Sequence, residues 1–332
     1  MLDIIMPHYK EPWEKGAKFF MMLDLQRGID FSQVNVIIVN DGEENHLFVD
    51  ELDNKQYKVR QIDIPHAGVS AARNAGLEAA TEEWVMFCDF DDMFANVYAL
   101  RDILGVLPAP NKDMLWTTFI SEDPGENGAM RLWPRGQNLV FTHGKLYRRQ
   151  MLLDNNLRFD TRLSFNEDSC FNAIMAIVVP YQRIGEIKTP APSYIWCWSP
   201  DSTVNKNGST SKAIIGQYQR NKIVCDAYRE RMPVGSYGGM ILRTAYDTYY
   251  ALNADNLPED LEVMLEDFKS WWKEHKVFAK YAKEEDVPKI LDIAKREHEA
   301  LERQNKDRGK VDEVLNFQNE KSFEDWLKEC EE

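Results

Sequence analysis

The feature that most constrains the fold is the run at residues 34–40, VNVIIVN, which is apolar and β-branched with almost no alternation. A strand with one buried face alternates apolar and polar side chains, whereas a continuous apolar run is typical of a strand buried on both faces. Further apolar runs occur in the N-terminal part of the chain, separated by segments of helical character. The runs cover residues 2–6, 59–64 and 84–88, and the helical segments cover residues 16–27 and 69–80. Strands that alternate with helices predict an α/β fold around a mostly parallel sheet flanked by helices.

Beyond residue 92 the pattern is mixed. Residues 113–120 and 138–142 are typical of strands, while the Pro, Gly and charged residues of 111–137 indicate that this segment includes loop. From about residue 211 apolar residues recur at helical spacing amid dense charge. A chain of 332 residues is long enough for two domains. We therefore expect a catalytic α/β domain over residues 1–210 and a helical C-terminal extension over residues 211–332.

Composition narrows the classes of function and location. The formal net charge of −15 repels phosphate backbones, which disfavours nucleic acid as a partner. Five scattered cysteines without C-x-x-C spacing argue against a structural zinc site and a disulfide framework. The start MLDIIMPHYKEP lacks the pattern of a signal peptide, and no run of about 18 apolar residues predicts a transmembrane helix. We expect a cytoplasmic protein.

An acidic cluster follows the apolar run at residues 84–88. Asp89, Asp91 and Asp92 lie within four residues, and carboxylates this close repel one another unless a cation or a donor compensates. Oxygen ligands of this kind suit magnesium or manganese. A solvated acidic turn that caps the next helix is the alternative. The position favours a ligand site, because α/β sheets bind ligands beyond the carboxyl ends of their strands.

Four segments between residues 4 and 94 carry a family resemblance: IIMPHYKEP, VIIVNDGEE, HAGVSAARNAGLEAA and WVMFCDFDDMF, in that order. Together they resemble the signature of the family 2 glycosyltransferases, and the resemblance extends over roughly residues 2–205. It implies the GT-A (Rossmann-like) fold. It also implies an inverting, metal-dependent transfer of a sugar from a nucleotide-sugar, with a UDP-sugar as donor and Mn²⁺ or Mg²⁺ as cofactor.

The resemblance also implies roles for single residues. Pro7 and Tyr9 would shape the loop beneath the nucleotide, and Asp41 would bond the base, with uracil expected. Arg73 would contact the base or a phosphate. Asp89 would reach the ribose or the metal.

Asp91 is the main metal ligand that the resemblance implies, bridging to the diphosphate, and Asp92 would support the same turn. The chain departs from the family pattern at Glu43, where Ser is usual, and at His66, where Asn is frequent. These departures leave the base-binding aspartate intact and bear on nucleotide preference.

A second acidic pair, Glu167 and Asp168, precedes the apolar stretch 171–179. Acidic residues are common at this place for a simple reason, since negative charge suits a helix N-terminus. The preceding stretch HGKLYRRQMLLDNNLRFD resembles the segment that leads to the family's catalytic base. The resemblance therefore implies Asp168 as general base and Glu167 as its support. A carboxylate within hydrogen-bond reach of the acceptor hydroxyl is a competent base.

His143 and Lys145 precede that stretch. His143 would be a third metal ligand or a phosphate contact, or else a structural histidine beside a strand. Lys145 would neutralise the diphosphate or pair with an acid.

The segment SYIWCWSPDSTVNKN alternates aromatic residues, with Tyr194, Trp196 and Trp198 on one face of a strand. Such a face suits a sugar ring and equally suits core packing. By resemblance, the loop at 199–209 closes over the donor, and Ser202 or a neighbour touches the diphosphate.

Two other classes of function stay open at this point. One is a nucleotidyltransferase or pyrophosphorylase, although the first strand lacks the Gly-rich, basic loop that class usually carries. The other is a non-catalytic nucleotide-sugar-binding scaffold. The acceptor is not identified by the sequence, and a saccharide, a lipid-linked sugar or a peptide would each be compatible. Any homo-oligomer is expected to form through residues 211–332.

Overall fold

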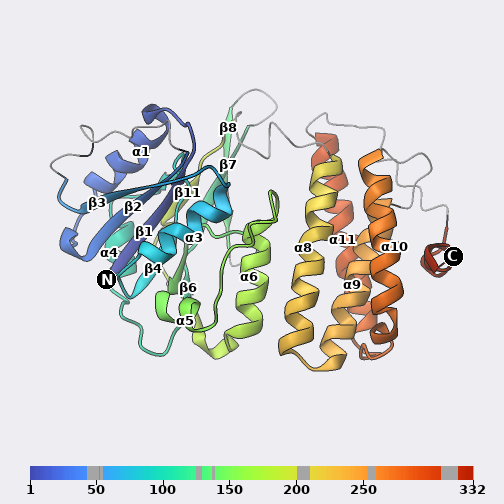
Figure 1. Ribbon diagram of the computed structural model, residues 1–332. Helices are drawn as coiled ribbons and strands as arrows, with labels where there is room; N and C mark the ends of the chain where they lie inside the picture. Colours follow the sequence, from blue (N-terminus) through green and yellow to red (C-terminus); the bar gives the residue numbers. More distant parts are fainter. Residues whose placement is uncertain are drawn as a thin grey trace. The chain divides into compact units, whose positions relative to one another are not determined.

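The computed structural model divides the chain into two compact units, Met1–Asn205 and Lys206–Glu332 (Figure 1). The structure describes residues 1–42, 52, 55–124, 129–136, 139–199, 210–252, 259–307 and 321–331. The two units are described separately below.

The first unit is built on a seven-stranded sheet with the order β10-β6-β9-β4-β1-β2-β3. Its strands are β1 (Leu2–His8), β2 (Val34–Asp41), β3 (Lys58–Ile64), β4 (Trp84–Phe87), β6 (Met114–Trp116), β9 (Lys145–Arg148) and β10 (Ile184–Glu186). Strand β1 runs parallel to β2 and β4, β2 runs parallel to β3, and β6 runs parallel to β10. Only β9 is antiparallel to its neighbours, β4 and β6. The predicted mostly parallel sheet is therefore confirmed.

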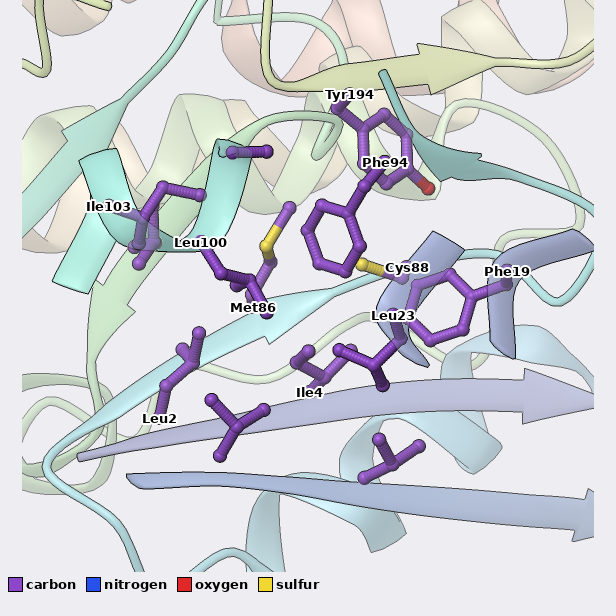
Figure 2. Packing of buried hydrophobic residues seen from close by; sticks show 14 of the residues in the cluster. Leu2, Ile4, Phe19, Leu23, Met86, Cys88, Phe94, Leu100, Ile103 and Tyr194 are labelled. Atoms are coloured by element: carbon purple, nitrogen blue, oxygen red, sulfur yellow. The ribbon is translucent and has the colours of Figure 1, made fainter. Parts of the chain in front are cut away.

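Helices cover this sheet and bury both of its faces. They are α1 (Trp13–Asp24), α3 (Val69–Ala79), α4 (Ala99–Leu104), α5 (Arg149–Asp154) and α6 (Glu167–Val178), with short 3₁₀ turns at Phe31–Gln33 and Tyr181–Arg183. All eight residues of β2 are buried, as the run VNVIIVN predicts. Ile4 and Ile5 of β1 belong to different core clusters, because successive side chains of a strand point to opposite faces. Figure 2 shows the first cluster, in which Ile4 packs with Phe19 and Leu23 of α1.

A second, four-stranded sheet has the order β5-β11-β7-β8. Its strands are β5 (Met93–Phe94), β7 (Phe119–Pro124), β8 (Met130–Arg135) and β11 (Tyr194–Trp196). The strand expected at 113–120 is two strands, β6 and β7, which belong to different sheets. Residues 139–142 of the strand expected at 138–142 are not in a strand, and β9 begins only after Gly144. Gly144 has φ 66°, and a Cβ there would lie 2.9 Å from Thr117 Oγ1, so the chain turns tightly at this point.

The second unit is helical. Its helices are α8 (Thr210–Arg231), α9 (Val234–Leu252), α10 (Glu259–Ala279), α11 (Val287–Asp307) and α12 (Phe323–Glu331). Helices α8, α9, α10 and α12 share one aromatic core, in which Phe268 of α10 stacks on Trp272 and on Trp326 of α12. The predicted helical C-terminal region is confirmed.

Among the described residues, no helix is both long enough and apolar enough to cross a membrane. The five cysteines, all of them described, are buried and form no disulfide.

Candidate functional site

Polar side chains meet where the parallel strands β1, β2 and β4 end. The register pairs His8 of β1 with Asn40 of β2, and Ile5 of β1 with Phe87 of β4. The residues that follow these strands therefore emerge at one edge of the sheet, where α/β folds bind ligands. Asp41 and Asp89 both lie at this edge.

Asp41 joins the end of β2 to the start of α3. Its Oδ1 accepts from the backbone N–H of Ala67 at 2.6 Å, and its Oδ2 accepts from Gly68 N–H at 2.9 Å. His66 Nδ1 lies 2.9 Å from the same Oδ2. Gly68 has φ 91°, which lets the chain turn into the helix directly after these two donors. The buried carboxylate predicted to bond the base thus also organises the turn around it.

Tyr9 and His66 form an exposed stacked pair beside Asp41. Their ring centroids are 4.2 Å apart with an interplanar angle of 15°, and Tyr9 is 40 % exposed. The flat surface that the pair presents at the strand ends is of a kind that can take a planar base. His66 appeared in the sequence only as a departure from a family pattern, and its stacking partner is set by the fold. Pro7, predicted to act with Tyr9, lies within β1 opposite Val39.

Arg73 of α3 binds carboxylates from both acidic segments. Its Nη2 donates to Asp89 Oδ1 at 2.9 Å, and its Nη1 donates to Glu167 Oε1 at 2.9 Å and to Asp168 Oδ1 at 2.7 Å. The guanidinium also lies over the Phe159 ring, 5.2 Å from its centroid. Arg73 is 2 % exposed, so these ion pairs are largely shielded from water. The structure thereby brings together residues that the sequence places about 95 positions apart.

One guanidinium does not neutralise three carboxylates, and the pKa values reflect this imbalance. Burial raises the pKa of Glu167, Asp168 raises it further, and Arg73 opposes the shift. Burial alone would lower the pKa of Arg73, but the surrounding carboxylates raise it well above its usual value. The site therefore has an excess of negative charge at neutral pH.

Asp168 is held from two sides and does not cap its own helix. Its Oδ1 binds Arg73, and its Oδ2 accepts from Thr142 N–H at 3.1 Å and from Thr142 Oγ1 at 2.8 Å. Helix α6 begins next to Asn166, whose φ of 62° is left-handed and whose side chain makes no capping hydrogen bond. The sequence did not predict Thr142 as a partner of Asp168, because a single threonine forms no recognisable motif.

Asp89, Asp92 and His143 form a group that could hold a metal ion. His143 Nε2 lies 3.6 Å from Asp89 Oδ2 and 3.5 Å from Asp92 Oδ2, and a set of one ligand atom from each residue lies within 4.8 Å. Neither ring nitrogen of the buried His143 has a hydrogen-bond partner within the described part of the chain. A buried imidazole that faces two carboxylates without a hydrogen bond is a typical environment for a cation ligand.

The charges of this group are strongly coupled. Burial would raise the pKa of Asp89, but Arg73 and His143 outweigh it and hold that pKa below its usual value. Burial raises the pKa of Asp92 well above its usual value, and His143 opposes this shift only in part. Burial would lower the pKa of His143, yet the two aspartates raise it. A divalent cation would relieve the repulsion between the carboxylates.

Sheet β5-β11-β7-β8 closes the group on one side. Tyr194 of β11 donates from its hydroxyl to Asp92 Oδ2 at 2.6 Å and accepts from Asp89 N–H at 3.3 Å. Trp196 of β11 stacks on His143, with centroids 5.0 Å apart and an interplanar angle of 17°. Tyr194 and Trp196 of the predicted aromatic stripe therefore have a structural part in the site, whereas Trp198 lies beyond the end of β11. The polar role of Tyr194 was not expected from its pattern.

The other predicted site residues lie as follows. Asp91 is half-buried, and its carboxylate is not part of the Asp89–Asp92–His143 group. Burial and Asp89 raise the pKa of Asp91. Lys145 is buried, donates to Phe141 O, and has its pKa lowered to about 8 by burial, against the opposing effect of Asp168. Ser202 lies outside the described residues.

Comparison with known proteins identifies a family that matches part of this chain. Residues 3–165 match the family described as Glycosyl transferase family 2. Over 195 residues the chain is 26 % identical to the uncharacterized glycosyltransferase EpsJ of Bacillus subtilis (strain 168), covering 52 % of this chain and 55 % of EpsJ. Over 204 residues it is 28 % identical to the uncharacterized glycosyltransferase YibD of Escherichia coli (strain K12), covering 53 % and 58 %. The matched part thus spans about half the length of these relatives.

Solved structures of TarS from S. aureus resemble the chain over most of its length. The complex of TarS 1–349 with UDP-GlcNAc aligns with a TM-score of 0.65 at 16 % identity and covers 92 % of each chain. The complex with UDP aligns with a TM-score of 0.61 at 16 % identity and covers 90 % of this chain and 87 % of the other. At this identity the likeness concerns the fold, and the predicted GT-A-like α/β fold with a helical C-terminal region is confirmed.

Proposed function

This chain belongs to the glycosyl transferase family 2 through residues 3–165, and we propose that it transfers a sugar from a UDP-sugar to an acceptor hydroxyl with inversion at the anomeric carbon. The observation that carries the proposal is the position of Arg73, which holds Asp89 and Asp168 close to His143. One small region thus combines a candidate base, a candidate cation site and a buried guanidinium.

The proposed base is Asp168. Its carboxylate accepts three hydrogen bonds, from Arg73 and from two atoms of Thr142, and an ionised carboxylate offers about four lone-pair sites. It is thereby fixed in orientation and retains capacity for the proton of an acceptor hydroxyl. The acceptor oxygen would attack the anomeric carbon from the face opposite the diphosphate, which inverts the configuration. Glu167 would keep Arg73 oriented.

The proposed cation site is Asp89, Asp92 and His143, with Mn²⁺ or Mg²⁺ as the ion. Two carboxylates and one imidazole fit such an ion, and the His143 ring nitrogens, which face the carboxylates without a hydrogen bond among the described residues, support the assignment. A divalent cation bound there would offset the negative charge that develops on the leaving diphosphate. Asp91, the main ligand expected from the sequence, is the alternative that the variants below distinguish.

The proposed donor is a UDP-sugar. The support is the stacked Tyr9–His66 pair beside Asp41, together with the TarS structures that hold UDP and UDP-GlcNAc. A planar base would lie on the exposed Tyr9 ring, close to the polar end of β2. In this arrangement the nucleotide would bind beside Asp41, and the acceptor hydroxyl would bind at Asp168.

The experiment that tests this function is calorimetric titration with UDP and GDP, each with and without Mn²⁺, followed by hydrolysis of UDP-GlcNAc. We expect UDP to bind at least tenfold more tightly with Mn²⁺ than without it, and more tightly than GDP. Absence of nucleotide binding under all conditions would contradict the proposal. Binding without any turnover of a panel of UDP-sugars would favour the scaffold instead.

Single substitutions distinguish the proposed base from the proposed cation ligands. Asp168→Asn should leave UDP binding intact and lower turnover by about 10²- to 10⁴-fold, the usual range for a general base. Asp154→Asn is the matched control, since this exposed residue of α5 binds only Gln150 among the described residues. His143→Ala should remove the Mn²⁺ dependence of UDP binding. If Asp91→Asn removes it and His143→Ala does not, the cation lies at Asp91.

A further inference from the structure

Strand β8 is exposed along its whole length and carries two arginines and a tryptophan on one face. Arg131, Trp133 and Arg135 are two residues apart, so they share a face of the strand, and Trp133 is 48 % exposed. We call these residues the Arg–Trp strip. A large aromatic side chain left in solvent between two cations is an arrangement that marks binding surfaces more than packing.

The strand register places the strip on the face that also carries the site. Trp133 pairs with Ser121 of β7, which pairs with Trp196 of β11, the residue that stacks on His143. In the next row Arg135 pairs with Phe119, whose ring lies 5.6 Å from that of His143. Residues opposite one another in a ladder share a face, so the strip lies on the face of this sheet that packs on His143, at its exposed edge beside the buried Ser121 and Phe119.

The distance from strip to site fits an extended ligand. Adjacent strands lie about 4.8 Å apart, so Trp133 is displaced by about 10 Å from Trp196 across the sheet. Arg131 and Arg135 are separated by about 13 Å along the strand, from the rise per residue. A chain that reaches the site with one hydroxyl would pass over the strip with the units that follow.

The cations of the strip are available for a ligand. Arg135 Nε donates to Ser121 Oγ at 2.9 Å, which holds its guanidinium on this face without neutralising it. Asp123 lies opposite Arg131 in the register. Within the part of the chain that the structure describes, however, neither arginine forms an ion pair. Because the protein as a whole carries a net charge of −15, this concentration of positive charge is local.

We propose that the Arg–Trp strip binds the acceptor, and that the acceptor is a glycan chain bearing anionic groups such as phosphates. The proposal rests on the function proposed above, because that function requires a sugar or polyol hydroxyl at Asp168. The guanidinium groups of Arg131 and Arg135 match the geometry of phosphate or carboxylate oxygens. Trp133 between them offers a face on which the apolar side of a sugar ring stacks.

Two other readings of the strip are tested against this one. Charged residues and proline on an edge strand protect it from pairing with another chain, and β8 carries both, including Pro134. Protection alone gives no reason for the exposed Trp133. A second copy of the chain docking on Trp133 is the other reading, and it predicts a change of oligomeric state when the strip is altered.

The test uses the full-length chain and three polymers of similar length: dextran phosphate, neutral dextran and polyphosphate. We expect dextran phosphate to bind more tightly than both others, with an affinity that falls as salt rises. The variant Arg131→Ala/Arg135→Ala should weaken its binding roughly five- to thirty-fold, as expected for two exposed charge pairs. Arg131→Lys/Arg135→Lys should recover part of the loss, and Trp133→Ala should weaken dextran phosphate more than polyphosphate.

The matched control is Arg229→Ala/Arg231→Ala, which removes the same charge from exposed positions at the end of α8. It should leave dextran phosphate binding unchanged. Equal binding of dextran phosphate and dextran by the unaltered chain, or equal losses in the control and the strip variant, would overturn the proposal. A strip variant that changes the sedimentation coefficient and not the affinity would assign the strip to self-association.

Hydrolysis of UDP-GlcNAc without any acceptor keeps the two proposals apart. If hydrolysis and UDP binding persist in the strip variants while dextran phosphate binding falls, both proposals are supported. If the unaltered chain hydrolyses the donor but shows no preference for dextran phosphate, only the strip assignment fails. If dextran phosphate binds at the strip and no nucleotide binds at all, the proposed transfer fails, and with it the role of the strip as acceptor site.

Discussion

Replacing Arg73 by glutamine would remove the cation that three carboxylates share and leave Asp89, Glu167 and Asp168 close to one another. The side chain of Arg73 is 3 % exposed, and its bonds to the three carboxylates are 2.7–2.9 Å long. Breaking a buried ion pair on one side costs about 3–5 kcal/mol. A loss of this size is a large part of the roughly 5–15 kcal/mol by which a folded domain is stable.

The penalty of Arg73→Gln should depend on pH in a definite direction. In the native chain the pKa of Asp89 is lowered, chiefly because Arg73 outweighs the effect of burial, so this carboxylate contributes stability above its unfolded pKa and loses it as pH falls. In the variant, burial and mutual repulsion would raise the pKa of Asp89 above its unfolded value and raise further the already elevated pKa of Glu167. The stability that those groups contribute is then fully present below about pH 4 and is lost as pH rises through their raised pKa values. The difference between the two chains should be largest near pH 7 and shrink towards pH 4.

The assay is urea denaturation followed by circular dichroism and tryptophan fluorescence at pH 7, 5.5 and 4. Arg158→Ala is the control, because its half-buried guanidinium pairs at 3.9 Å with the exposed Glu78, and such a pair contributes about 0–1 kcal/mol. Adding Glu167→Gln to Arg73→Gln should restore part of the lost stability. A penalty below about 1 kcal/mol at pH 7, or the same penalty at pH 4, would refute the electrostatic reasoning.

Three further changes probe the packing around the site and in the second unit. Gly76→Ala should destabilise the chain by about 1–3 kcal/mol in the same urea denaturation assay, in spite of alanine's helix propensity, because the new Cβ would lie 2.3 Å from Ile5 Cγ2. Gly239→Ala is the control: its Cβ would lie 3.3 Å from its nearest neighbour, Ile290 Cδ1, and its stability should stay within about 1 kcal/mol of the native chain. Tyr194→Phe removes the hydroxyl that donates to the fully buried Asp92 and should cost about 1–3 kcal/mol, measured as a lower urea midpoint. Phe268→Ala should cost about 3–5 kcal/mol of helical-unit stability, seen by circular dichroism, and a loss under 1 kcal/mol would contradict the packing of its ring on Trp272 and Trp326.

Local pattern was enough to predict the sheet and the segments that line its edge. The continuous apolar run at residues 34–40 requires burial on both faces of the strand. A strand buried on both faces needs covering helices, and these are α1, which precedes it in the chain, and α3, which comes after it. Asp89, Asp91 and Asp92 come directly after such a strand, so their place at the sheet edge follows from order along the chain.

The strand predictions made from the sequence were wrong where strand formation depends on residues distant along the chain. Strand β8 has all six residues exposed, so its side chains follow no apolar alternation, and the Pro, Gly and charges of 111–137 indicated loop instead. The segment 139–142 has apolar residues that the structure leaves outside any strand, with Val140 exposed. Strand pairing is decided by neighbours that a window of sequence does not contain.

The sequence by itself determined the class of fold and the chemical types of the site residues, because buried strands, turn glycines and acidic clusters leave marks within a few positions of the chain. Only the tertiary structure decided that Arg73 joins Asp89 to Asp168, that Asp92 rather than Asp91 faces His143, and that the Arg–Trp strip lies on the sheet face that packs on His143. Each of these contacts joins segments that are distant along the chain. Their distance depends on strand register and on the packing of helices against the sheet, which no single segment specifies.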